Sequence, residues 1–554
     1  MKIRCLGAVR TVTGSCFQME NSRGGYTLLD CGVFQGGRQT ELRNFNTPIY
    51  KPLDLNSIVI THAHMDHSGL VPRLVKAGYK GPVYSSEATC ELLNILWEDA
   101  AHIQEQEAQW KTRKNKRQGA GTVEALYTLD DVKKAQTLLR PLPYETDSEV
   151  APDLYVRYFQ AGHILGAASV LVTAVEPAGQ SHILFSGDLG RQGQLLVPDP
   201  IVPPHADLIF METTYGNRLH KNLNDSIDEF LETVNTAYKS GGKILIPAFA
   251  VERTQEIIFL LSKAWHEGKI PKDLPVILDS PLATLTSGVY VHHPELLDVE
   301  SNELLAKGIS PLKMDTLKVT RTAEESQKIN DIKGSAIIVA GSGMANAGRI
   351  LHHLKHNIWR KDCHVIFIGF QAQGTTGRRL VEGADTIKLF REPVSVKATI
   401  HTIGGFSGHA DQKELIEWLR PQVHDKLVVT LIHGEESGTL AFEELVKKTF
   451  PNVTTKVPHW LETLEVTPHE AKFIVKEGME PQVVTEAIGA PSYVESLEYK
   501  SLSERLARLQ RTLTPRTAPF RPNDLANLEA LLNMAEEIML KDTSSIQDPR
   551  DQSL

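Results

Sequence analysis

The chain has 554 residues, of which 41% are hydrophobic and 23% are charged, and its formal net charge is -9. This length exceeds the roughly 250 to 300 residues at which one hydrophobic core stops growing, so at least two domains are expected. The sequence has no apolar run of about 18 residues, which excludes a membrane-spanning helix, and no apolar signal-peptide core, so a cytoplasmic location is expected. The negative net charge does not indicate a nucleic-acid-binding protein, and a polyanionic substrate would need locally placed cations.

The five cysteines are too scattered to form a disulfide framework or a thiolate zinc site. Their number is odd and no C-x-x-C pair occurs. They are Cys5, Cys16, Cys31, Cys90 and Cys363. Any bound metal must therefore rely on histidine and carboxylate ligands.

Short β-like runs dominate the first 210 residues. They are TLLD (27–30), SIVI (57–60), LYVRYF (154–159), SVLVTAV (169–175), HILFSGD (182–188) and DLIFME (207–212). Helix-favouring residues at 85–112 and 129–140 predict two helices between these β-like runs. The basic segment KTRKNKR at 111–117 is expected to be a solvated helix end or loop, with a phosphate-contacting arm as the alternative.

The stretch THAHMDHSG follows the second of these runs and places His62, His64, Asp66 and His67 within six positions. Residues two apart on an extended chain point to the same side, so His62 and His64 can bind one metal ion together. Asp66 and His67 could then reach a second ion about 3.5 to 4 Å away, as in two-metal hydrolases. A lone histidine is usually structural, but no structural need explains four ionisable groups packed here.

Three later residues, His163, Asp188 and His433, also follow apolar strands. One ion could be held by His62, His64 and His163, and the other by Asp66, His67 and His433, with Asp188 bridging the two. Such His and carboxylate sets suit Zn²⁺. The sequence thus predicts two Zn²⁺ ions per chain.

From residue 217 to 395 each continuous apolar run is followed by a helix-like stretch, which indicates a parallel, doubly wound second domain. Residues 396–479 return to strand and helix units with histidines at strand ends. Residues 480–554 carry leucines at helical spacing, with prolines between two runs, and predict a helical C-terminal extension.

THAHMDHSG, LLDCG, AGHILGAAS and FSGDLG together resemble the metallo-β-lactamase superfamily, and METTYG, GGFSGHAD and LIHGE resemble the extra motifs of its β-CASP nucleases. The resemblance covers about residues 1–465 and is closest to prokaryotic relatives of the cleavage-and-polyadenylation endonuclease subunit. It implies an α/β fold in which a Rossmann-like β-CASP domain (217–395) is inserted into an αββα sandwich (1–216 and 396–479). The helical tail lies outside the family pattern.

For the reaction, the residues suit hydrolysis of a phosphodiester by a hydroxide held between two metal ions and Asp188, and the resemblance implies that the substrate is RNA. Asp66 can orient this hydroxide or accept its second proton. His409 is the expected general acid for the leaving 3′-oxygen, and Glu212 can orient it, roles that the resemblance also implies. Asp30 is expected to bond a ligand histidine or a neighbouring loop rather than a metal ion.

GSGMANAGR (341–349) opens like a dinucleotide-binding loop, but the glycine spacing is wrong and no acidic ribose partner is identifiable. We expect its backbone, at Ser342 and Gly343, and that of GTTGRR (374–379) to contact RNA phosphates. Arg349, Arg378 and Arg379 are candidate phosphate clamps, although each could equally be a salt-bridged surface arginine.

The sequence therefore predicts a zinc-dependent ribonuclease that acts on single-stranded RNA, with no membrane partner. It leaves open endonuclease or 5′-to-3′ exonuclease action, and the oligomeric state, for which a homodimer is one candidate. RNA is favoured over DNA only by the resemblance. Two alternatives are a small-molecule metallohydrolase of the thioesterase or lactonase type and a non-catalytic RNA-binding scaffold.

Overall fold

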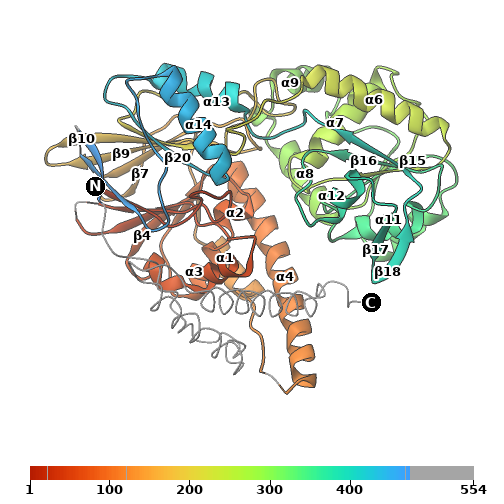
Figure 1. The fold of residues 1–554 in the computed structure, drawn as a ribbon, viewed down its shortest axis with the longest axis horizontal. Helices are drawn as coiled ribbons and strands as arrows, with labels where there is room; N and C mark the ends of the chain where they lie inside the picture. The colour runs from red at the N-terminus through yellow and green to blue at the C-terminus, as the bar shows by residue number, and fades with distance from the viewer. Residues whose placement is uncertain (22, 120, 468–469, 475–554) are drawn as a thin grey trace, which may run out of the picture. The chain divides into compact units, whose positions relative to one another are not determined.

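A computed structural model describes residues 1–21, 23–119, 121–467 and 470–474 of the chain (Figure 1). The predicted helical extension at 480–554 lies outside the described residues. By internal contacts most of the described chain forms one unit, whereas 109–124 and 388–394 belong to a second one. Among the described helices, none is long and apolar enough to cross a membrane.

Two mixed sheets form the first domain. The first sheet has the order β23 (Glu470–Ile474), β22 (Thr463–Thr467), β1 (Lys2–Cys5), β2 (Phe17–Glu20), β3 (Tyr26–Leu29), β4 (Leu55–Val59), β5 (Val83–Ser85) and β6 (Leu139–Pro141). The second has the order β21 (Thr454–Lys456), β20 (Val428–Ile432), β11 (Leu208–Glu212), β10 (Gly179–Phe185), β9 (Ala168–Glu176), β8 (Leu154–Gln160) and β7 (Ser148–Ala151).

An apolar core joins these two sheets. Phe17 of the first sheet lies with its ring centroid 5.5 Å from Phe185 and 5.3 Å from Phe210, which both belong to the second. The rings of Phe185 and Phe210 stack at 4.5 Å. Large aromatic side chains bury much apolar area, so this cluster holds the sheets face to face.

Helices cover the outer faces of the sandwich. Figure 1 shows α13 and α14 on the side of β20, and α2 and α3 on the side of β4. The helices of this domain are α1 (Arg38–Leu42), α2 (Met65–Ser68), α3 (Val71–Lys76), α4 (Glu87–Arg117), α5 (Leu129–Gln136), α13 (Gln412–Leu419) and α14 (Glu436–Thr449), with 3₁₀ turns η1 (Arg43–Phe45), η2 (Thr47–Tyr50) and η5 (Arg420–Gln422). The expected αββα sandwich is confirmed, and KTRKNKR forms the end of α4.

The second domain is inserted between two adjacent strands of the sandwich. The chain leaves after β11, and the next strand of the sandwich is β20, which pairs with β11 in parallel, Leu208 opposite Val428. Its sheet has the order β14 (Leu317–Val319), β13 (Val276–Leu278), β15 (Ala336–Ala340), β12 (Lys243–Pro247), β16 (His364–Ile368) and β19 (Thr399–Ile403). All of these pairs are parallel, as expected from the buried apolar runs.

Helices and short turns connect the parallel strands. They are α6 (Leu223–Lys239), α7 (Arg253–His266), α8 (Pro281–His292), η3 (Pro294–Leu296), α9 (Val299–Ala306), α10 (Ala323–Lys328), η4 (Ile329–Asp331), α11 (Arg349–Asn357) and α12 (Thr376–Val381). Strands β17 (Thr386–Leu389) and β18 (Glu392–Ser395) pair separately. β19 follows residue 395 in sequence yet completes this sheet, and the domain boundaries themselves stay a prediction.

Side-chain caps fix where several helices begin. Thr128 and Asp131 form a reciprocal capping box at α5, and Asp411 and Glu414 form one at α13. Each box satisfies backbone N–H groups that a first helical turn leaves without partners. The box at α13 fixes the chain just after His409, and so sets the entry of that histidine into the site described next.

Candidate metal centre

Seven histidine and aspartate side chains gather at one edge of the sandwich. His62, His64, Asp66 and His67 follow β4 or lie in α2, whereas His163, Asp188 and His433 follow β8, β10 and β20. These strands run in the same direction within their sheet, so their carboxyl ends meet at one edge. The structure thus brings together the seven residues that the sequence grouped, in two sets, His62, His64, His163 and Asp188, and Asp66, His67 and His433.

In the first set, three imidazole nitrogens converge. Nδ1 of His64 lies 3.1 Å from Nε2 of His62 and 3.2 Å from Nε2 of His163. The other nitrogen of His163 donates to the backbone oxygen of Gly408 at 2.6 Å, and that of His62 lies 3.1 Å from Thr61 Oγ1. Outward hydrogen bonds of this kind fix which nitrogen faces a metal ion.

In the second set, Nε2 of His67 and Nε2 of His433 face each other at 3.1 Å, and Asp66 Oδ2 lies 3.7 Å from His433 Nε2. Asp188 stands between the two sets. Its Oδ2 is 3.5 Å from His62 Nε2 and 3.4 Å from His67 Nε2. Its Oδ1, 3.4 Å from His433 Nδ1, is buried without a hydrogen-bond partner among the described residues.

This arrangement fits metal ions better than protons. His163 and His67 use their Nδ1 atoms for hydrogen bonds to the Gly408 oxygen and to Asp30, so in the neutral rings the inward Nε2 atoms carry lone pairs that can bind a cation. Burial lowers the pKa of His62 well below its ordinary value and that of His163 to about 4, which favours the neutral, ligating form. His67 differs, because Asp188 and Asp30 raise its pKa against the effect of burial. The buried Asp188 oxygen and these nitrogens form a donor set typical of zinc.

Asp30 holds one of these histidines from behind. Its carboxylate accepts from His67 Nδ1 at 2.7 Å, from Ser15 Oγ at 3.1 Å and from the Thr61 backbone at 2.9 Å. The residue is 1% exposed and follows β3 with φ of 59°, a left-handed conformation that costs a non-glycine residue free energy. Asp30 therefore orients His67 and the loop of Thr61. This is the geometry expected from the sequence, in which Asp30 bonds a candidate ligand histidine or a neighbouring loop.

Two glycines permit close backbone packing at the site. Gly187, just before Asp188, has φ of +59°, and a Cβ there would lie 2.7 Å from the carbonyl oxygen of Ala168. At Gly408, just before His409, a Cβ would lie 2.1 Å from a carboxylate oxygen of Glu252. Neither position could hold a larger residue without moving its neighbour.

His409 and Glu212 form a pair beside the two sets. Glu212 ends β11, is buried, and accepts from His409 Nδ1 at 3.2 Å and from the Leu189 backbone at 2.6 Å. The His409 ring lies 4.6 Å from that of His163. Burial alone would lower the pKa of His409, but the Glu212 carboxylate raises it to about 10, which favours the protonated ring.

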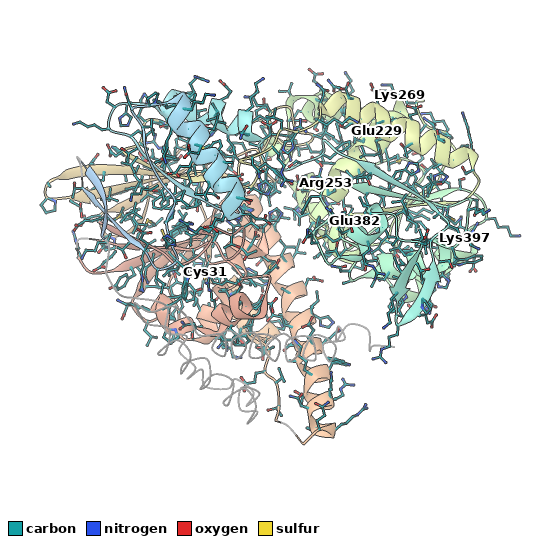
Figure 2. The ribbon with its side chains drawn as sticks, viewed as in Figure 1. Cys31, Glu229, Arg253, Lys269, Glu382 and Lys397 are labelled. Atoms are coloured by element: carbon teal, nitrogen blue, oxygen red, sulfur yellow. The ribbon has the colours of Figure 1, made fainter. Side chains whose placement is uncertain are left out.

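Glu252 and Gln194 also border the site, and the sequence reading missed both. Gln194 Nε2 donates to the His163 backbone oxygen at 2.9 Å and to Glu252 Oε1 at 3.2 Å. Arg253, labelled in Figure 2 and the first residue of α7, lies 3.4 Å from the same carboxylate. Glu252 lies in the segment PAFAVERTQE (247–256), and nothing in that segment indicates that its glutamate meets the loop of His409.

The expected phosphate contacts lie at the carboxyl edge of the second-domain sheet and already have protein partners. Arg349 donates to Asp279 at 2.6 Å, Arg378 to Glu382 at 2.7 Å, and Arg379 to the Thr386 backbone at 3.3 Å. Ser342 Oγ accepts from the Asn346 backbone at 3.2 Å, and the Gly343 oxygen accepts from Gln371 at 3.1 Å. Their contact with RNA stays a prediction.

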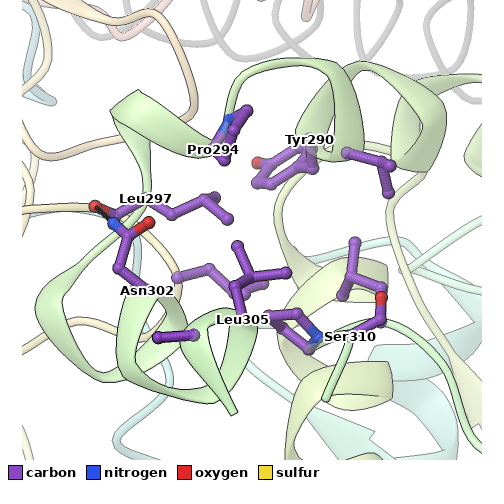
Figure 3. Close-up of a pocket in the computed structure, with 11 residues that line it drawn as sticks. Tyr290, Pro294, Leu297, Asn302, Leu305 and Ser310 are labelled. Carbon is purple, nitrogen blue, oxygen red and sulfur yellow. Dashed lines mark hydrogen bonds between the residues drawn. The ribbon is translucent and has the colours of Figure 1, made fainter. Parts of the chain in front are cut away.

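A cavity of about 470 Å³ opens elsewhere, between α8 and α9 (Figure 3). Its lining is mostly apolar, with Tyr290, Leu297 and Leu305 facing inward and Asn302 and Ser310 as polar members. It contains no histidine or carboxylate, so it does not have the groups that hydrolysis requires.

Comparison with known proteins decides the family. The description "Metallo-beta-lactamase superfamily" matches residues 10–216, "Beta-Casp domain" matches 254–380, and "Zn-dependent metallo-hydrolase RNA specificity domain" matches 393–458. A protein named ribonuclease TTHA0252, from Thermus thermophilus, is 37% identical over 449 residues, which cover 80% of this chain and 96% of that protein. The chain belongs to the β-CASP family of the metallo-β-lactamase superfamily.

Other relatives of this chain carry a different name. The transcription termination factor FttA of Methanocaldococcus jannaschii is 29% identical over 477 residues, covering 84% of this chain and 72% of the relative. That of Methanosarcina mazei is 30% identical over 478 residues, with the same coverage. The predicted family and enzyme class, a metal-dependent nuclease that binds RNA, are confirmed.

Proposed function

We propose that this β-CASP protein is a zinc-dependent ribonuclease that hydrolyses phosphodiester bonds of single-stranded RNA. One zinc ion would be held by His62, His64 and His163 and a second by Asp66, His67 and His433, with Asp188 between them. The observation that carries the proposal is the presence of this buried donor set next to the His409–Glu212 pair. When bound, the ions would make a water molecule acidic enough to attack phosphorus at neutral pH.

The protein groups divide the proton transfers between them. As the water oxygen forms its bond to phosphorus, Asp66 would take up its proton. As the bond from phosphorus to the 3′-oxygen breaks, His409 donates a proton to that oxygen. Because Glu212 accepts the Nδ1 proton of His409, the Nε2 proton is left for transfer to the leaving group.

RNA as the substrate is supported by the match of residues 393–458 to an RNA specificity domain and by the relative named as a ribonuclease. The site itself would accept any phosphodiester, because its groups address the phosphate and the leaving oxygen. The mode of cleavage, a cytoplasmic location and a homodimer stay predictions.

A His409→Ala variant tests the role of the general acid. We expect it to cleave labelled RNA about 100-fold or more slowly than the wild type, since positioned proton donors contribute about that much. Its rate on a nucleoside p-nitrophenyl phosphate should stay close to that of the wild type, because nitrophenolate leaves without a proton. Equal losses on both substrates would contradict the assignment and indicate a general defect of the site.

The same preparations separate the alternatives. A His409→Ala variant with full activity on the true substrate, or a wild type that hydrolyses thioesters or lactones but not RNA, would favour a small-molecule hydrolase. Purified protein with less than one zinc per chain and no chelator-sensitive cleavage would favour an RNA-binding scaffold.

A further inference from the structure

A row of aromatic and cationic side chains leads away from His409. The Tyr215 ring meets that of His409 edge-on at 5.9 Å, and the guanidinium of Arg218 lies 5.1 Å from the centre of the Tyr215 ring. The same guanidinium lies 5.8 Å from the ring centre of Phe370. We call Tyr215, Arg218 and Phe370 the stacking row.

The loops that carry the stacking row are tied to the site. Tyr215 and Arg218 follow Glu212 at the end of β11, and the Arg218 backbone oxygen accepts from the Gln412 backbone, at the start of α13, at 3.1 Å. Phe370 follows β16, and its neighbour Gln371 donates to the Gly343 oxygen at 3.1 Å. The ring is therefore held at a strand end of the second-domain sheet, although it is 53% exposed.

The chemistry of the row suits a nucleobase. Phe370 presents an apolar face to water at a cost in free energy, which a base stacked on it would remove. Arg218 is exposed, bonds the Asn217 side chain at 3.4 Å, and has no carboxylate within ion-pair distance among the described residues. A guanidinium over aromatic rings with no anionic partner is suited both to a base and to the phosphate beside it.

We propose that the stacking row binds the RNA strand on the 5′ side of the scissile phosphate, with a base stacked on Phe370 and a phosphate on Arg218. The direction follows from the proposed function, on which this inference rests. His409 serves the 3′-oxygen of the upstream nucleotide, so the row that begins at His409 meets the strand that continues upstream.

The test combines Phe370→Ala with RNA that lacks single bases. In wild-type protein, removal of the base at one upstream position should lower kcat/KM about tenfold, since one stacked base contributes roughly that much. Phe370→Ala should show a similar loss on intact RNA and no further loss when that base is missing, whereas Phe370→Trp should keep the wild-type rate. Trp359→Ala is the matched control, because Trp359 is also 53% exposed but precedes β16 at the opposite end of that strand. It should behave as the wild type.

Two results would overturn the inference. One is a kcat/KM of Phe370→Ala on intact RNA that equals the wild-type value. This result would show that the exposed Phe370 ring does not bind RNA and would favour contact with a protein partner. The other is an equal penalty for the missing base in both proteins. Binding of the same RNA, followed by fluorescence anisotropy in the presence of chelator, gives a readout without cleavage. Tenfold weaker binding by Phe370→Ala would support the stacking row even if the proposed function failed, and failure of that function would show as wild-type protein that does not cut RNA.

Discussion

His163 links the donor set to the residue proposed as general acid. Its Nε2 faces His64, while its Nδ1 donates to the backbone oxygen of Gly408, the residue before His409. One side chain thus positions both the metal-facing nitrogen and the loop of the proton donor. A shift of about 1 Å in such a group can cost about 100-fold in rate. Because a side chain at Gly187 or Gly408 would displace its neighbours, we expect these two glycines to be needed for activity.

Asp30 is the residue whose substitution best separates metal retention from folding. We expect Asp30→Asn to bind zinc about 10- to 100-fold more weakly, because the amide cannot accept from His67, Ser15 and Thr61 as the carboxylate does. Competition with a chromophoric chelator measures the affinity, and circular dichroism checks folding. Asp54→Asn, at an exposed position, should leave zinc affinity unchanged. A folded Asp30→Asn protein with wild-type affinity would show that Asp30 does not support the site.

At the scale of elements, the end of β13 ties the second domain together. Asp279 follows β13, is fully buried, and accepts from Arg349 and His353 of α11, each at 2.6 Å. It also accepts from Ser326 of α10 at 2.7 Å and from Thr320. Burial alone would raise the pKa of Asp279, but these four donors lower it below its ordinary value of 3.8. Arg349, predicted from the sequence as a phosphate clamp, therefore has a structural partner.

The Asp279 cluster predicts a pH-dependent loss of stability. Because the folded pKa lies below the unfolded one, the carboxylate stabilises the protein above pH 3.8 and loses this effect as the pH falls further. At pH 7, Asp279→Asn should lower the free energy of unfolding by about 3 kcal/mol, since it leaves buried donors unpaired. The difference in unfolding free energy between the wild type and Asp279→Asn should become smaller below about pH 4.

Urea unfolding at several pH values measures this effect, with the exposed Asp315→Asn variant as control. A difference between wild type and Asp279→Asn that stayed constant down to pH 3 would show that the ionised carboxylate is not the source of the stability.

For the whole molecule, local patterns predicted the parallel sheet and the strand ends of the site, whereas the αββα sandwich with an inserted domain was implied by the family resemblance. Continuous apolar runs indicated the parallel sheet, and polar residues at strand ends indicated where His62, His163, Asp188 and His433 would gather. Contacts between loops far apart in sequence could not be read in this way. Glu252 meets the loop of His409, and Phe370 meets Arg218, only because separate strand ends converge.

Local sequence patterns also did not show that β19 belongs to the second-domain sheet. β19 pairs with β16, although a histidine-bearing strand after residue 395 resembles the units of the sandwich. Strand pairing is fixed by tertiary packing, which a local pattern does not contain.

The central claim, a two-zinc centre that cuts RNA, is tested most directly by titrating metal-free protein with zinc. Cleavage of 5′-labelled single-stranded RNA is followed at each addition, and bound zinc is measured on the same samples. We predict no cleavage without metal and activity that rises until two zinc ions are bound per chain. Cleavage that survives complete metal removal, or activity that is complete with one zinc per chain, would contradict the claim.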